Sequence, residues 1–268
     1  MRNLRSIALV LCVAAPPIQA QVDTVSHRPY FSWRDAAIIE GFAILAVSAA
    51  PLDRELAGRL QNPGLQENQR IRQTAMLVRT VADPGSFLIG AGLYVGGRLT
   101  KQKRLADLGL HGTEALFLGG QLGTLLKGLA GRARPYVNVD NPHNYSWGRG
   151  FGSRDYRSMP SGHTIAAFAA ASAVTSETHR WWPRSTWIVG PVMYGGASLV
   201  GWSRMFNNQH WASDVIVGAA VGTFAGLKVV HWHHSHPGNI IDRTLLGPFV
   251  APGADRSTVV GFQLTSPF

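Results

Sequence analysis

Apolar segments of helical length make up most of the chain, and few stretches alternate between apolar and polar residues as a half-buried strand does. The clearest apolar segments cover residues 35–50, 103–131, 164–178, 186–202 and 212–231. Residues 52–62 and 65–82 carry mixed charge at helical spacing, with Asn62-Pro63-Gly64 as a turn between them. This pattern predicts a mainly α fold, a bundle of about six core helices joined by short loops.

The C-terminal tail departs from the helical pattern. Residues 257–264, with the sequence Ser-Thr-Val-Val-Gly-Phe-Gln-Leu, are rich in β-branched residues and predict a short strand or hairpin. The pattern assigns no function to the residues from about Asn239 onward.

The N-terminus has the features of a secretory signal peptide. Arg2 and Arg5 precede a short apolar stretch from Ile7 to Ala15, which two prolines then interrupt. Nine apolar residues are too few to span a bilayer, so a signal peptide over residues 1–20 is favoured over an uncleaved anchor. The single cysteine, Cys12, lies inside this segment. A mature chain would therefore have no disulfide, no thiolate metal site and no thiol nucleophile.

The chain is strongly basic, with a formal net charge of +10. Arginine outnumbers lysine 21 to 4, and an excess of arginine suits phosphate groups or anionic membrane surfaces. A compositional bias toward arginine explains the charge equally well. Nucleic-acid binding is not expected, because no basic stripe with interleaved aromatic residues supports it.

Hydropathy leaves two arrangements open. Only residues 185–203 approach the length of a membrane span, about 20 residues, without an Asp, Glu, Lys or Arg, and they include Pro191 and several glycines. The mean hydropathy of +0.03 is low for a protein that crosses a membrane several times. These features favour a globular bundle outside the inner membrane, resting on its surface. An integral bundle is the alternative, because Gly- and Ala-rich helices pack closely in lipid.

The first of three candidate motifs contains Lys127 and Arg134, followed by Pro135. A separation of seven residues places both cations on one face of a helix, which the proline is expected to end. Two cations at a helix end could hold a dianion. Basic residues near a helix C-terminus also occur simply because they favour the helix dipole.

The second motif, Pro160-Ser161-Gly162-His163, precedes an apolar segment and therefore marks a helix N-terminus. Free backbone N–H groups at such a position favour an anion. Gly162 would let a phosphate approach the backbone, Ser161 would cap the helix or donate to a phosphate oxygen, and His163 would reach into the same space. For this tetrapeptide alone, simple capping with a surface histidine is the favoured reading.

The third motif runs from Ser203 to Asp214 and contains Arg204 and His210. His210 and Asp214 are four residues apart, so we expect them on one face of a helix. A carboxylate on one ring nitrogen fixes the tautomer and leaves the other nitrogen free to attack. Arg204 supplies a further cation. A His–Asp pair on a helix surface is the ordinary alternative.

Taken together and in this order, the motifs resemble the signature of the type 2 phosphatidic acid phosphatase superfamily. That superfamily also includes bacterial non-specific acid phosphatases and vanadium haloperoxidases. The signature is Lys-x6-Arg-Pro, Pro-Ser-Gly-His and Ser-Arg-x5-His-x3-Asp, and every position is matched within residues 100–232.

The resemblance implies a role for each motif residue. His210 would form a phosphohistidine, Asp214 would orient it, and His163 would protonate the leaving oxygen. The groups that bind the phosphoryl oxygens would be Lys127, Arg134, Ser161, Gly162 and Arg204. The resemblance implies no metal and no cofactor, with vanadate as an inhibitor. Phosphoryl transfer is compatible with this, since cations and backbone N–H groups can neutralise the phosphoryl oxygens without Mg²⁺.

With this resemblance, the chain divides into four parts. We expect a signal peptide at 1–20, an N-terminal helical region of the bundle at 21–100, a phosphatase core at 101–235 and a C-terminal tail at 236–268. The protein would be exported to the periplasm or to the periplasmic face of the cell membrane.

Three enzymatic functions fit these motifs. A phosphatase of lipid phosphates, such as phosphatidate or polyprenyl pyrophosphate, is favoured by the apolar helical chain and its charge. A broad-specificity periplasmic acid phosphatase is favoured by the signal sequence and the low hydropathy. A vanadium-dependent haloperoxidase is less favoured, although vanadate would occupy the same pocket. A non-enzymatic scaffold is the least supported, because it would not need every chemically required position.

Three other groups of residues lie outside the motifs. Residues 136–159 form a predicted loop beside the site, in which Trp147 and Phe151 are expected to shape leaving-group preference. The histidines at 231, 233, 234 and 236 could bind Zn²⁺, but a polar helix end is favoured, since no acidic residue follows before Asp242. Asp107, His111 and Glu114, in the helix before Lys127, receive no assigned role.

Overall fold

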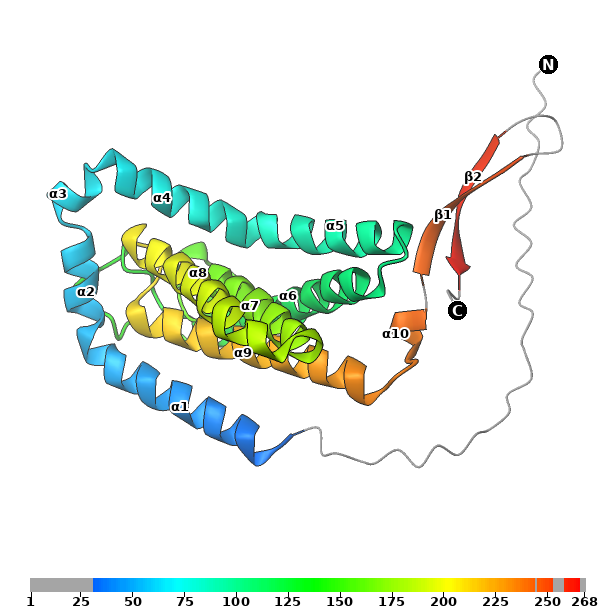
Figure 1. Ribbon diagram of the computed structural model, residues 1–268. Helices are drawn as coiled ribbons and strands as arrows, with labels where there is room; N and C mark the ends of the chain where they lie inside the picture. Colours follow the sequence, from blue (N-terminus) through cyan, green and yellow to red (C-terminus); the bar gives the residue numbers. More distant parts are fainter. Residues whose placement is uncertain (1–30, 244, 253–257, 266–268) are drawn as a thin grey trace, which may run out of the picture.

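The computed structural model describes residues 31–243, 245–252 and 258–265, so the predicted signal peptide lies outside the described residues. In chain order the main elements are α1 (Trp33–Ala49), α2 (Asp53–Leu60), α3 (Pro63–Gln66), α4 (Gln69–Thr80), α5 (Ser86–Leu99), α6 (Lys103–Ala130), α7 (Gly162–Trp181), α8 (Thr186–Phe206), α9 (Ala212–Ser235), α10 (Ile240–Arg243), β1 (Leu245–Pro252) and β2 (Thr258–Thr265). The prediction of a mainly α helical bundle is confirmed (Figure 1).

Helix α7 lies at the centre of the bundle, where it packs against α6, α8 and α9. The buried positions at this centre are mostly small, as Ala169 and Ala173 illustrate. At Gly222 of α9 the two helix backbones approach closely, since a Cβ there would lie 2.3 Å from the carbonyl oxygen of Ile165. The core therefore depends on close approach of helix backbones, the mode of packing that small residues allow.

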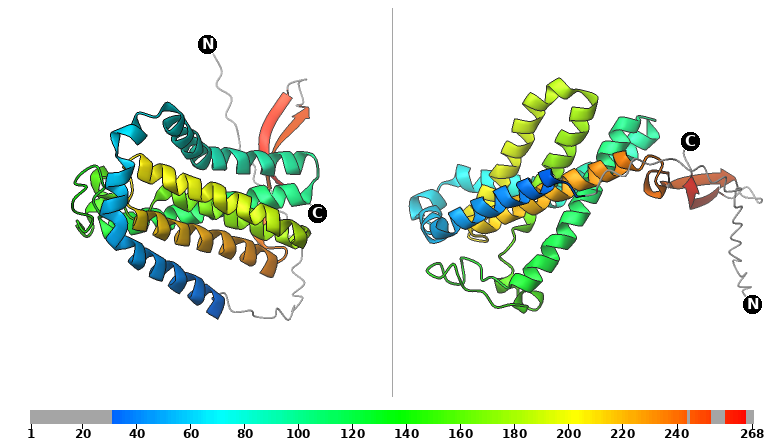
Figure 2. Two further views of the ribbon diagram at one scale, coloured as in Figure 1. Left: turned by 60° about the vertical axis from the view of Figure 1, so that its left-hand side comes forward. Right: turned by 90° about the horizontal axis from the view of Figure 1, so that it is seen from below.

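The N-terminal helices form an outer layer around this centre. Helix α1 lies along α9, α4 packs against α8, and α5 packs along α6. Helix α2 crosses one end of the bundle, and the long loop between α6 and α7 lies at the same end (Figure 2). This end holds the candidate site described below.

The tail forms a pair of strands, the second of which the sequence predicts. Strands β1 and β2 are antiparallel, with Leu245 opposite Thr265 and Pro252 opposite Thr258. The prediction covered only the second strand, because β1 contains Gly and Pro, which weaken the signal of a strand.

Three local predictions were wrong. Helix α6 ends at Ala130, within one residue of the apolar segment 103–131, and does not continue to Pro135 as the first motif led us to expect, because Gly131 adopts φ +54° and caps the helix in the left-handed conformation. Helix α9 begins at Ala212, so His210 precedes the helix instead of sharing a face with Asp214. The expected turn at Asn62 is the start of the short helix α3, whose first turn the Asn62 side chain caps.

Large apolar side chains are exposed around the bundle. Val47 of α1 is 73% exposed, Leu88 of α5 is 70% exposed and Trp187 of α8 is 87% exposed. Other exposed apolar residues on these helices and on α6 are Ile44, Leu45, Ile89, Val95, Phe117, Leu125, Ile188, Val192 and Leu199. Extensive apolar surface of this kind marks a membrane or protein contact.

The exposed apolar surface bears on whether the bundle crosses a membrane or rests on its surface. Among the described residues, Trp33–Leu60 and Ala212–Ser235 are long and apolar enough to cross a membrane, by length and composition. The exposed surface favours the integral bundle over the globular bundle that the hydropathy favoured. Mean hydropathy hides this distinction, because it averages the apolar helix faces with the polar loops and helix ends.

Candidate active site

The motif residues meet in one pocket of about 250 Å³ at the α2 end of the bundle. Its lining consists of Lys127, Arg134, Arg154, Arg157, Gly162, His163, Arg204 and His210. None of these lining residues is acidic, so the pocket concentrates positive charge. Such a pocket suits a small dianion.

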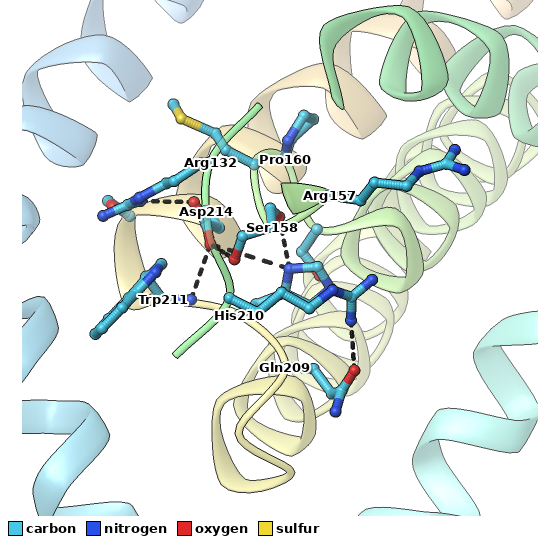
Figure 3. Close-up of polar contacts among 12 residues, drawn as sticks. Arg132, Arg157, Ser158, Pro160, Gln209, His210, Trp211 and Asp214 are labelled. Carbon is cyan, nitrogen blue, oxygen red and sulfur yellow. Dashed lines mark hydrogen bonds and ion pairs between the residues drawn. The ribbon is translucent and has the colours of Figure 1, made fainter. Parts of the chain in front are cut away.

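His210 lies in the short connection between α8 and α9 and is only 4% exposed. Its Nδ1–H donates to the carbonyl oxygen of Ser158 at 2.6 Å, which leaves the lone pair of Nε2 free (Figure 3). Burial lowers the pKa of His210 well below its ordinary value, and the cations at Lys127 and Arg134 lower it further. The ring is therefore neutral and can act as a nucleophile.

Asp214 does not contact His210 in the way that we expected from the sequence. The distance from the Asp214 Oδ2 to the His210 Nδ1 is 4.0 Å. The carboxylate instead accepts hydrogen bonds from the Ser158 hydroxyl at 2.5 Å and from the Trp211 backbone N–H at 2.9 Å. Because α9 begins after His210, Asp214 caps that helix and positions the histidine indirectly, through Ser158 (Figure 3).

Arg132 was missed by the sequence reasoning. This buried side chain lies 2.6 Å from Asp214 Oδ1 and 2.8 Å from Asp53 Oδ2 of α2. It also donates to the carbonyl oxygen of Pro142. Asp53 and Arg132 are 79 residues apart, so no local pattern could have connected them.

The cations of the motifs are held at the rim by backbone and side-chain oxygens. Lys127 donates to the carbonyl oxygens of Pro160 and Arg157. Arg134 donates to the side chain of Gln209. Arg204 is only 6% exposed, and its Nε is a buried donor without a hydrogen-bond partner. An oxyanion in the pocket would satisfy such a donor.

The Pro-Ser-Gly-His motif separates into pocket residues and a supporting residue. Gly162 and His163 begin α7 and line the pocket, as a helix N-terminus that binds an anion would. Ser161 is fully buried behind them, and its Oγ accepts a hydrogen bond from Thr164 at 2.8 Å. Ser161 and Asp214 are thus the predicted site residues that do not line the pocket.

Comparison with known proteins identifies the part of the chain that holds this pocket. Residues 110–237 match the family model of the PAP2 superfamily. This segment belongs to the PAP2 superfamily. The resemblance stated from the motifs is therefore confirmed.

Relatives of known name match parts of the PAP2 segment. Lipid A 1-phosphatase of Porphyromonas gingivalis is 45% identical over 98 residues, which are 34% of this chain and 20% of that protein. The lipid A 1-phosphatase of Rhizobium johnstonii is 34% identical over 113 residues, or 40% of this chain and 41% of that protein. That of Rhizobium etli is 32% identical over 125 residues, or 45% and 48%. The chain thus spans less than half the length of these relatives.

A solved structure shares the fold. The crystal structure of a transmembrane PAP2 type phosphatidylglycerolphosphate phosphatase from Bacillus subtilis aligns with a TM-score of 0.53 at 18% identity. The alignment covers 78% of this chain and all of that one. At this identity the likeness establishes the fold alone.

Two arginines beyond the signature line the pocket of the PAP2 segment. Arg154 and Arg157 come from the loop between α6 and α7, where the sequence reasoning singled out aromatic residues instead. Trp147 is 82% exposed and does not line the pocket, and Phe151 packs its ring on Gly128 of α6. The loop therefore contributes positive charge to the pocket. The arginine content of residues 149–157 was the available signal.

Proposed function

We propose that this chain is a metal-independent phosphatase that hydrolyses lipid phosphates through a phosphohistidine at His210. The observation that carries the proposal is the buried His210, whose Nδ1 is bonded to Ser158 and whose Nε2 is free, in a pocket lined by cations. Phosphoryl transfer requires an aligned nucleophile and neutralisation of the phosphoryl oxygens, and this pocket offers both.

The reaction would take two displacements. In the first, Nε2 of His210 attacks phosphorus, the bond to the leaving oxygen breaks, and protonated His163 gives that oxygen a proton. Burial and the surrounding cations lower the pKa of His163 to about 3, so this step requires the bound phosphate dianion to raise that pKa. In the second, His163 takes a proton from water as the water attacks the phosphohistidine, which releases inorganic phosphate and restores both histidines. Throughout, Lys127, Arg134 and Arg204 would hold the other phosphoryl oxygens.

An apolar groove supports a lipid as the substrate. The groove has a volume of about 360 Å³ and lies between α1, α6 and α9. Its lining residues are Ile39, Phe42, Ala43, Leu122, Leu125, Leu126, Val217, Ala220, Val221 and Phe224. Leu126 adjoins Lys127 in the chain, and Val217 follows Asp214 by about one helical turn. We propose that this groove holds a lipid chain whose phosphate enters the pocket.

We further propose that the bundle is embedded in the cell membrane with the pocket facing the periplasm. The exposed apolar side chains of α1, α5 and α8 support the embedding. The signal-like N-terminus supports the periplasmic orientation. The signal peptide, the N-terminal helical region, the catalytic core and the tail would keep the boundaries given above.

The first experiment measures phosphate release by the purified protein with EDTA present. Lipid A, phosphatidate and polyprenyl pyrophosphate, each dispersed in detergent, are compared with p-nitrophenyl phosphate. We expect release that strongly favours a lipid, is insensitive to EDTA and is inhibited by vanadate. Equal or faster release from the soluble ester would contradict the lipid assignment and favour a broad acid phosphatase. Bromide oxidation by peroxide that depends on vanadate would identify a haloperoxidase instead.

A further inference from the structure

A cluster of histidine and acidic side chains lies at the other end of the bundle from the phosphatase pocket. It joins α6, α9 and α10, and Figure 1 shows α10 at the end away from α2. Within α6, His111 and Lys127 are 16 residues apart, which corresponds to about 24 Å along the helix. The cluster is therefore separate from the phosphatase chemistry.

Three potential metal ligands converge in this cluster. Ligand atoms of His111, His233 and Asp242 all lie within 4.8 Å of one another. The Oδ1 of Asp242 is 2.7 Å from the Nδ1 of His233 and 3.7 Å from the Nε2 of His111. Two imidazole nitrogens and a carboxylate form a donor set typical of zinc.

His111 supplies an independent indication of a ligand. The side chain is 2% exposed, and its Nε2 is buried without a hydrogen-bond partner. An unsatisfied buried nitrogen costs free energy. A cation bound between His111 and Asp242 would remove this cost.

The outer nitrogens of both histidines are hydrogen-bonded to glutamates. His111 Nδ1 is 2.6 Å from Glu177 Oε1, and His233 Nε2 is 2.6 Å from Glu114 Oε2. Metal-binding histidines usually donate their second ring N–H to a carboxylate in this manner. With those N–H groups used, the two inner nitrogens are acceptors that face the acceptor oxygens of Asp242. A cation between the three groups would satisfy these acceptors, and a proton shared by His233 Nδ1 and Asp242 Oδ1 at 2.7 Å is the alternative that the measurement of metal content below distinguishes.

The remaining neighbours hold the cluster in place. Asn239 donates to Asp242 Oδ2 at 2.6 Å and so orients the carboxylate. The rings of His111 and His233 stack with centroids 3.9 Å apart. His234 also contacts Glu177, at 2.9 Å, and the group His111, Glu177 and His234 shares His111 with the proposed ligand set.

We propose that His111, His233 and Asp242 bind one Zn²⁺, with a water in the fourth position. The ion would connect α6 to the end of α9 and to α10, the element from which the tail begins. This site goes beyond the proposed phosphatase function and takes no part in it.

Zinc retention by the full chain in detergent tests the proposal. The protein is dialysed against chelator, reloaded with Zn²⁺, desalted and analysed by mass spectrometry for metal content. We expect about one zinc per chain and a rise in melting temperature on reloading. Asp242→Asn and His111→Ala should abolish retention, and Glu114→Gln should weaken zinc affinity by about tenfold. His236→Ala, an exposed histidine one turn beyond the ligands, is the matched control and should bind as the wild type does.

Several outcomes would overturn the zinc site. These are a wild-type chain that retains no zinc, or an Asp242→Asn chain that retains as much as the wild type. Asp242→Asn keeps the shape of the side chain, and far-UV circular dichroism checks that it remains folded. Phosphatase turnover of this variant should stay within about twofold of wild type, since the site is about 24 Å from Lys127. Metal content therefore reports on the zinc site, and phosphatase turnover reports independently on the proposed phosphatase function.

Discussion

At the scale of single residues, a relay of buried contacts holds His210. Its Nδ1 donates to the Ser158 carbonyl oxygen, the Ser158 hydroxyl donates to Asp214, and Asp214 pairs with Arg132. The Asp214 carboxylate thus positions His210 through one intervening residue, Ser158. The histidine keeps a neutral ring because burial and the neighbouring cations disfavour its protonated form.

Replacing His210 tests its assignment as the nucleophile. We expect His210→Ala to abolish turnover and to abolish the acid-labile phosphoenzyme, because no other group lies in its position. Rapid acid-free quenching with labelled substrate measures the phosphoenzyme. His143→Ala, in the exposed part of the loop, is the control and should retain both signals. A His210→Ala protein that still traps labelled phosphate would refute the assignment.

The pH dependence follows from the lowered pKa of His210. A lowered pKa means that the ring loses its proton at a lower pH, so the neutral nucleophile persists as pH falls below the ordinary value of 6.5. We expect kcat/KM, corrected for substrate ionisation, not to fall between pH 7.5 and 5.5, because His210 stays neutral while Lys127, whose pKa burial lowers to about 7, becomes more fully charged. A histidine of ordinary pKa would lose about tenfold over that range. A tenfold acid loss with a midpoint near 6.5 would contradict the expected shift.

At the scale of secondary-structure elements, Asp53 connects the outer helix α2 to the catalytic centre. It accepts hydrogen bonds from the Ser213 backbone N–H at 2.9 Å and from Arg132 at 2.8 Å. One buried carboxylate therefore binds α2 to the start of α9 and to the loop after α6. The site depends in this way on a helix that lies outside the PAP2 segment of residues 110–237.

Removal of the Asp53 carboxylate should destabilise this connection. We expect Asp53→Ala to lower the free energy of unfolding by about 3–5 kcal/mol, because Arg132 would keep a buried charge with one partner lost. Glu55→Ala changes an exposed residue of the same helix and should cost less than about 0.5 kcal/mol. Denaturant unfolding in detergent measures both. Equal effects of the two substitutions would show that Asp53 does not carry the connection.

At the scale of the whole molecule, apolar helix faces separate two polar ends. One end holds the phosphatase pocket, and the other holds the histidine and acidic cluster. The apolar groove between α1, α6 and α9 opens on the surface between them. Under the proposed function, this groove is the route by which the lipid substrate approaches the pocket.

Filling the groove should separate lipid from soluble substrates. We expect Ala220→Trp to raise KM for the preferred lipid by about tenfold. This factor corresponds to losing the burial of one or two methylene groups of the lipid chain. Hydrolysis of p-nitrophenyl phosphate should not change, because the groove is outside the cationic pocket. Ala37→Trp, on α1 but not in the groove lining, is the matched control. A loss of both activities in Ala220→Trp alone would mean a general disturbance and count against the groove.

The sequence by itself determined the helical class, the long helices and six of the eight residues that line the pocket. Helical periodicity is a local property, which is why α6, predicted at 103–131, is found at Lys103–Ala130. The motifs were recognisable because their chemistry requires particular residues at particular spacings. The roles assigned to those residues stay predictions until the experiments above are done.

Only the tertiary structure decided which distant residues support the site and which apolar helix faces remain exposed. Asp53 and Arg132 are 79 residues apart, and His111 of α6 lies beside Asp242 of α10. Neither contact therefore leaves a pattern in the local sequence. Local rules also placed Arg134 and His210 in helices. Gly131 ends α6 before Arg134, and α9 begins after His210, so His210 and Asp214 do not share a helix face. The exposed apolar faces appear only when packing shows which side of each helix is already covered. Sequence spacing specifies local geometry, whereas burial and long-range pairing depend on how all the helices pack together.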